Sequence, residues 1–263
     1  NRHFWGADGW FMADLVESSP FPLYYRSLLT LWIHKAVYVL LSPLGASGWV
    51  AIAASSSLAG AVVLQALWRI NPDPAFMAIN ILCGSFLVFV GHVENYAWIN
   101  TFLILSFESV LHWLRGDSKA WPAFTFLILA ILSHMLALFY IPAYGYLLWI
   151  HRRFDPLEIL IPLVAFSSLV AILGLCFPMM GTDIGLERLV PLGQVWAKNQ
   201  FFSFLSFPHL AMLLYFHWRA AFLGIPLEIP LLILLVRRID TVYLRFMLAC
   251  TFCGLFWTTI WHP

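Results

Sequence analysis

The chain is dominated by apolar runs of about 20 residues, which short segments rich in proline, glycine or charge separate from one another. A helix needs about 20 residues, at 1.5 Å per residue, to cross about 30 Å of hydrocarbon. Six runs have this length and predict membrane-spanning helices. They are 46–69, 74–91, 96–114, 156–178, 220–237 and 241–261.

A further apolar stretch, 120–150, is too long for one ordinary span. It is interrupted near Ser133 and His134 and again at Pro142, so it predicts two short helices that form a hairpin. With these two, the expected fold is all-α: a polytopic transmembrane bundle of about eight spans. The whole of 1–263 is expected to be a single transmembrane domain, and its two ends suggest a fragment of a longer chain.

The composition agrees with this interpretation. Hydrophobic residues make up 62% of the chain and charged residues only 10%, whereas about 25% of the residues of a soluble domain are charged. The 13 tryptophans fit a membrane–water boundary. The net charge of +1 provides no broad basic surface for nucleic acid. We therefore expect a multi-pass integral membrane protein with lipid as a partner and no nucleic acid.

Basic residues near the ends of the runs predict the orientation, because Lys and Arg favour the cytoplasmic side. With eight alternating spans, all of the basic clusters fall on one side of the membrane. The opposite, outer side then receives segments 1–45, 92–95, 133–136 and 179–207. The basic residues are Arg69, Arg115, Lys119, Arg152, Arg153, Arg237 and Arg238.

Two apolar segments do not fit as spans. Segment 24–41 carries Arg26, Thr30 and His34 on one helical stripe, and segment 209–224 carries two histidines and an arginine. Counting either segment as a span would place the basic clusters on both sides of the membrane. We expect two interfacial amphipathic helices, one in an outer loop over 1–45 and one in an outer loop over 179–219. The alternative is that one of them is a slightly polar span.

Two outer carboxylates are candidates for catalysis. Asp8 lies between two glycines in the segment 5–10, WGADGW, where flexible backbone could approach a ligand or a metal closely. It could equally be a turn residue that bonds its own backbone. Glu94, with His92 beside it, lies in a tight outer turn. It could act as a base or hold a metal, or it could cap the next helix.

Other outer residues could bind a substrate. His134 could line the same cavity or form a hydrogen bond to a carbonyl in the hairpin. Three outer cations, Arg26, Arg188 and Lys198, could bind a phosphate or pyrophosphate. Contact with lipid headgroups is their alternative role.

The order of these features resembles a known group. An outer acidic residue is followed by a helix that opens with Arg26, and a later outer turn carries Glu94 before Tyr96. This pattern resembles the GT-C superfamily of polytopic glycosyltransferases, including the dolichyl-phosphate-mannose–protein mannosyltransferase-like proteins. Stretches 89–96, 133–138 and 206–210 look like uncharacterised bacterial members, which implies the bacterial inner membrane.

The resemblance implies transfer of a sugar from a polyprenyl-phosphate donor on the non-cytoplasmic face. Asp8 would match the first-loop acidic residue and act as the general base, and Glu94 would match the second. Segment 7–9 lacks the paired acidic motif of the superfamily, so a divalent cation is an open expectation. The alternatives are a non-catalytic transmembrane subunit among other membrane-protein partners and, with less support, a transporter.

Overall fold

The computed structural model describes residues 7–22, 27–82, 96–151, 155–179 and 241–260. The elements in these ranges are all helical, and no strand occurs among them, so the all-α prediction is confirmed for this part of the chain. In order, they are α1 (Ala7–Ser18), α2 (Leu28–Leu41), η1 (Ser42–Leu44), α3 (Gly48–Ile70), α4 (Pro74–Leu82), α6 (Tyr96–Arg115), α7 (Trp121–Ser133), η2 (Met135–Tyr140), α8 (Ile141–Ile150), α9 (Pro156–Met179) and α15 (Thr241–Ile260).

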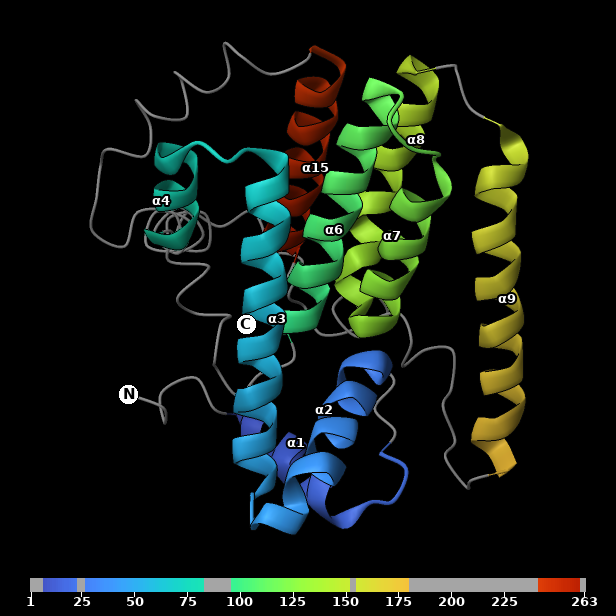
Figure 1. Ribbon diagram of the computed structural model, residues 1–263. Helices are drawn as coiled ribbons and strands as arrows, with labels where there is room; N and C mark the ends of the chain where they lie inside the picture. The colour runs from blue at the N-terminus through green and yellow to red at the C-terminus, as the bar shows by residue number, and fades with distance from the viewer. Residues whose placement is uncertain (1–6, 23–26, 83–95, 152–154, 180–240, 261–263) are drawn as a thin grey trace.

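The helices form an elongated bundle with a cap at one end (Figure 1). Helix α6 packs between α3 and α7, and α15 packs against α8, η2 and α6. Helices α1 and α2 pack on each other and on the first half of α3, and α2 also contacts α7. Helix α9 stands at the side of the bundle, where α7 is its main contact (Figure 1).

Aromatic rings fill the core between α6, α7, α8 and α15. The ring of Tyr144 lies 5.0 Å from that of Phe246 and 5.6 Å from that of Phe124, edge to face in both cases. Edge-to-face packing is a favoured geometry for aromatic pairs. The Tyr144 hydroxyl is hydrogen-bonded to Ser106, whose hydroxyl donates to the carbonyl of Ala123 at 2.5 Å. The hydroxyl of Tyr144, the only polar atom of its side chain, therefore has its hydrogen-bond partner inside the core.

The predicted break inside 120–150 is confirmed. Helix α7 ends at Ser133, and His134 follows in extended backbone, with φ −163° and ψ 133°. Pro142 lies in the first turn of α8, where its missing N–H does not disturb the helix. Helix α7 runs down and α8 runs back up in Figure 1, so the two form a hairpin.

Three basic residues of the predicted clusters, Arg69, Arg115 and Lys119, lie within the described ranges, and they gather at one end of the bundle. Arg69 of α3 is paired with Glu108 near the end of α6 at 3.1 Å. Arg115 and Lys119, at the end of α6 and just before α7, line one cavity with the end of α8 and the start of α9. This end, at the top of Figure 1, is called the basic end below.

Among the described residues, one helix is long and apolar enough to cross a membrane by length and composition. It is Gly48–Ile70, of 23 residues, with a mean hydropathy of 1.8. The eight-span arrangement stays a prediction. The other apolar helices are shorter over the described side chains: Leu28–Leu44, Trp121–Ser133, Met135–Ile150, Pro156–Leu169 and Thr241–Cys253.

Helix α2 differs from the prediction for segment 24–41. Its polar stripe was expected to lie along the interface, but Thr30 and His34 are fully buried against neighbouring helices. Its apolar Val39 and Leu40 are exposed instead. The reason is that hydrogen-bonding partners for the polar side chains lie inside the bundle, on α3 and at the end of α7. The other predicted interfacial helix, 209–224, and the loop 179–219 lie outside the described residues apart from Met179.

Candidate functional site

A layer of buried polar groups lies where α2 crosses α3, α6 and the end of α7. The hydroxyl of Thr30 donates to the carbonyl of Ser133 at 2.9 Å. Nδ1 of His34 lies 2.9 Å from Oγ of Ser55. The indole N–H of Trp98 donates to the same Oγ at 2.9 Å. These five residues, called the polar layer below, join four elements at the end of the molecule opposite the basic end.

Ser55 is the centre of the polar layer, because its hydroxyl serves both His34 and Trp98. Ser55→Ala is expected to lower the stability of the protein by about 1–3 kcal/mol, since both buried groups lose this partner. Ser57→Ala, on the exposed face of the same helix, is the control, because the Ser57 hydroxyl only bonds the carbonyl of Ala53. Thermal unfolding of the purified variants measures the difference, and equal midpoints would contradict the role of Ser55.

Three serine hydroxyls in the described part of the chain are buried and have no hydrogen-bond partner. They belong to Ser27, Ser56 and Ser133. Ser27 lies one helical turn before Thr30, which bonds the backbone of Ser133, so two of these hydroxyls are near the contact of α2 with α7. A buried hydroxyl without a partner costs about 1–3 kcal/mol. Ser27 and Ser133 are therefore buried polar groups next to the polar layer that lower the stability of the bundle.

Asp8 lies in helical backbone, which corrects one expectation. The segment between Gly6 and Gly9 was predicted to be flexible, but α1 begins at Ala7 and includes Asp8 in its first turn. Negative charge at this end of a helix is favourable, because the helix dipole is positive there. Positions 8, 12 and 16 share one face of α1, and Met12 and Val16 are buried against α2 and α3.

His134 caps the hairpin. Its Nδ1 accepts a hydrogen bond from the backbone N–H of Leu136 at 3.2 Å, and its ring lies 5.1 Å from the ring of Tyr96. His134 thus forms a hydrogen bond within the hairpin, but its partner is a backbone N–H and not the carbonyl that was expected. The contact with Tyr96 also joins the end of α7 to the start of α6.

The remaining predicted site residues lie outside the described residues. They are Arg26, His92, Glu94, Arg188 and Lys198. Two of them have described neighbours in the chain, since Ser27 follows Arg26 directly and Tyr96 is two positions after Glu94. Both neighbours belong to the elements that the polar layer joins.

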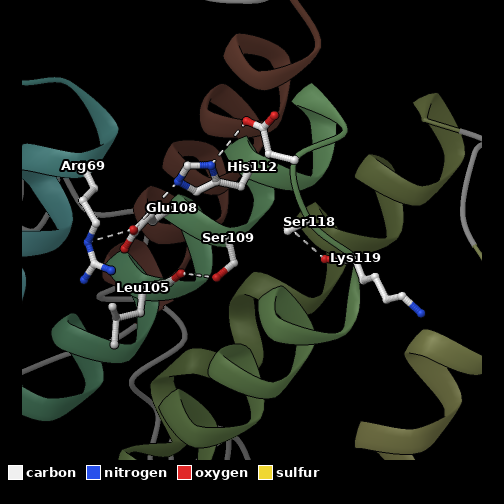
Figure 2. Close-up of polar contacts among 8 residues, drawn as sticks. Arg69, Leu105, Glu108, Ser109, His112, Ser118 and Lys119 are labelled. Atoms are coloured by element: carbon white, nitrogen blue, oxygen red, sulfur yellow. Dashed lines mark hydrogen bonds and ion pairs between the residues drawn. The ribbon is translucent and has the colours of Figure 1, made fainter.

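A second polar cluster, which the sequence did not predict, lies at the basic end (Figure 2). Arg69 of α3 contacts Glu108 of α6, and Nε2 of His112 lies 3.9 Å from the same carboxylate oxygen. Nδ1 of His112 lies 3.5 Å from Asp117. The side chain of Glu108 is only 8% exposed. The i,i+4 spacing of Glu108 and His112 was visible in the sequence, but the contact with Arg69 depends on how α3 packs on α6.

No group of three or more His, Cys, Asp or Glu side chains in the described ranges could hold a metal ion. The expectation that Glu94 and His92 hold a divalent cation concerns residues outside these ranges. Comparison of the chain with protein-family models, with curated proteins and with solved structures gave no match. The functional argument rests on the residues of this chain.

Proposed function

We propose that the chain is a multi-pass membrane protein whose bundle lies in the bilayer. The observation that carries this proposal is that several polar side chains are buried between the helices while large apolar side chains are exposed. Thr30, His34 and Ser55 are fully buried, while Leu40 and Leu44 are 74% and 82% exposed. In water this arrangement is unfavourable, because large exposed apolar surfaces are rare on soluble monomers. In hydrocarbon it is favourable, because polar side chains find partners only inside the bundle.

Helix α9 supports the same proposal. Its 24 residues span about 36 Å, enough to cross the hydrocarbon layer. Glu158, in its first turn, is its one charged residue. A helix that is apolar around its whole circumference is suited to a core or to a membrane. In the half of α9 whose side chains are described, the following large apolar side chains are exposed: Leu157, Leu160, Ile161, Leu163 and Val164.

Exposed tryptophans at the basic end also fit a membrane boundary. Trp68 lies next to Arg69 at the end of α3, Trp121 begins α7, and Trp149 lies near the end of α8. All three are exposed. Tryptophan favours the headgroup level of a bilayer. The tryptophans therefore fit either membrane boundary, and the basic residues favour a cytoplasmic position for this end.

For the activity, we propose a GT-C-like transfer of a sugar from a polyprenyl-phosphate donor at the opposite, non-cytoplasmic end. The convergence of α1, α2 and the start of α6 at that end supports this proposal. Helix α1 contributes Asp8. Glu94 is two positions before Tyr96, the first residue of α6. Arg26 adjoins the buried Ser27.

In the proposed reaction, Asp8 removes the proton from the acceptor hydroxyl as the oxygen attacks the anomeric carbon of the sugar. The bond between that carbon and the phosphate oxygen breaks, and the polyprenyl phosphate leaves with the electron pair. Arg26, Arg188 and Lys198 stabilise the charge on the phosphate. Glu94 and His92 orient the acceptor. Direct displacement inverts the anomeric configuration.

Reconstituted protein tests the proposal. The protein in lipid vesicles is supplied with a polyprenyl-phosphate sugar and a pool of acceptor peptides and glycans. The expected result is release of polyprenyl phosphate together with an inverted glycoside, at a rate that falls to background after heat denaturation. Stable co-purification with other membrane proteins, with no turnover of the donor by the assembly, would contradict the proposal and favour a non-catalytic subunit.

A further inference from the structure

The basic end holds a cavity of about 470 Å³ that the proposed reaction does not use. It is lined by the turn that joins α6 to α7, by His151 at the end of α8 and by the start of α9. Two cations, Arg115 and Lys119, and two carboxylates, Asp155 and Glu158, line it together with Trp113. The cavity therefore presents both signs of charge on a short stretch of surface.

One pair of these charges is already matched. Lys119 lies 3.6 Å from Glu158, and the other oxygen of Glu158 accepts the N–H of Ala120 at 2.7 Å. This contact fixes the start of α7 on the start of α9 and forms one wall of the cavity.

The second pair is not matched in this way. Arg115 forms no ion pair with any described residue. Asp155 is exposed, and one of its oxygens accepts the N–H of Leu157 at 3.0 Å, which leaves its second oxygen accessible. The cavity thus offers one guanidinium for an anion and one carboxylate for a cation.

An apolar surface begins directly beside the cavity. Leu157, Ile161 and Val164 are exposed and lie on one stripe of α9, because they are four and seven positions apart. The stripe leads away from the cavity along the helix. A molecule with a charged head at the cavity could therefore lay a hydrocarbon chain along α9.

We propose that this cavity binds the headgroup of a zwitterionic aminophospholipid, such as phosphatidylethanolamine, in the leaflet at the basic end. Arg115 takes the phosphate, as guanidinium groups commonly do. Asp155 accepts a hydrogen bond from the primary ammonium, and the acyl chains lie on the exposed stripe of α9. The inference rests on the membrane location proposed above and does not require the sugar-transfer activity.

Native mass spectrometry of the detergent-solubilised protein tests the inference with three lipids of identical acyl chains. We expect phosphatidylethanolamine to be retained about fivefold more than phosphatidylcholine, whose quaternary ammonium cannot donate a hydrogen bond. Retention of phosphatidylethanolamine should also exceed retention of phosphatidylglycerol, whose headgroup carries no cation. Asp155→Asn should bring the ethanolamine-to-choline ratio close to one, a change of about fivefold. Asn still caps the first turn of α9.

Arg115→Gln should reduce retention of both phosphatidylethanolamine and phosphatidylcholine. Arg245→Gln, which changes an exposed arginine of α15 outside the cavity, should change neither. Equal retention of the three lipids by the wild-type protein would overturn the inference, as would an unchanged ratio in Asp155→Asn. Competition by soluble phosphoethanolamine at the same concentration as the lipid would also overturn it. If the protein fractionates with membranes but retains the three lipids equally, the lipid-binding inference is wrong and the proposed function still stands.

Discussion

Asp8→Asn is expected to lower sugar transfer by about 10²- to 10⁴-fold, the range that a general base contributes. Asparagine has the size of aspartate and is well tolerated near the start of a helix, so α1 should still form and the protein should still accumulate in the membrane. The loss comes from the missing acceptor for the proton of the attacking hydroxyl. Initial rates of polyprenyl phosphate release, normalised to folded protein, measure the effect.

Asp14→Asn is the matched control, because Asp14 lies on the same helix and is exposed. The contact of Asp14 with Ser18 uses its backbone carbonyl and not its carboxylate. Its rate should stay within about threefold of the wild type, since the change removes the same charge without affecting a proton acceptor. If Asp8→Asn and Asp14→Asn turned over at the same rate, Asp8 would have no part in the chemistry.

Gly48→Val is expected to displace α1 from its close contact with α3. A Cβ at Gly48 would lie 2.7 Å from the backbone oxygen of Ala13 and 3.0 Å from Glu17, so α1 must move. The N–H of Gly48 also donates to Glu17 at 2.5 Å. Overpacking of this kind costs about 1–3 kcal/mol. Because α1 carries Asp8, a displacement of about 1 Å should lower transfer on the order of 10²-fold.

Thermal unfolding and limited proteolysis between α1 and α2 measure this displacement. Gly145→Ala is the control, because a Cβ at Gly145 in α8 meets no atom within 4 Å. That change should be neutral or slightly stabilising, by up to about 1 kcal/mol, since it reduces the freedom of the unfolded chain. Wild-type stability and turnover in Gly48→Val would show that α1 does not need its close contact with α3.

The sequence predicted the long helices well, because each apolar run ends at a proline, a glycine or a charge. The predicted span 46–69 corresponds to α3 (Gly48–Ile70), and the predicted span 96–114 corresponds to α6 (Tyr96–Arg115). The break at His134 was also predicted. These features depend on local composition, which is visible without knowledge of the packing.

The burial of the polar stripe of α2 could not be predicted in the same way. Thr30 and His34 have a helical spacing that fits an interfacial helix, and their true partners lie on other helices. One partner is the hydroxyl of Ser55 and the other is a backbone carbonyl at the end of α7. A backbone carbonyl carries no signal in the sequence. Only the packing of α2 on α3 and α7 brings these groups together.

The two polar regions were predictable to different degrees. The outer candidates could be named because Asp8 and Glu94 stand out in an apolar chain. Glu108 also stands out, yet sequence reasoning passed over it because it lies inside an apparent span. The contact that accounts for it, with Arg69, joins residues 39 positions apart. The cavity at Arg115 could not be predicted for the same reason, since the turn between α6 and α7, the end of α8 and the start of α9 build it together.

Sidedness is the central claim, and thiol labelling in intact cells tests it most directly. In a chain whose four native cysteines are replaced by alanine, Ser18→Cys marks the α1 end and Asp117→Cys marks the basic end. Both positions are exposed. A membrane-impermeant maleimide should label position 18 in intact cells and position 117 only after permeabilisation. Labelling of both positions from the same side, or recovery of the protein in the soluble fraction, would contradict the account.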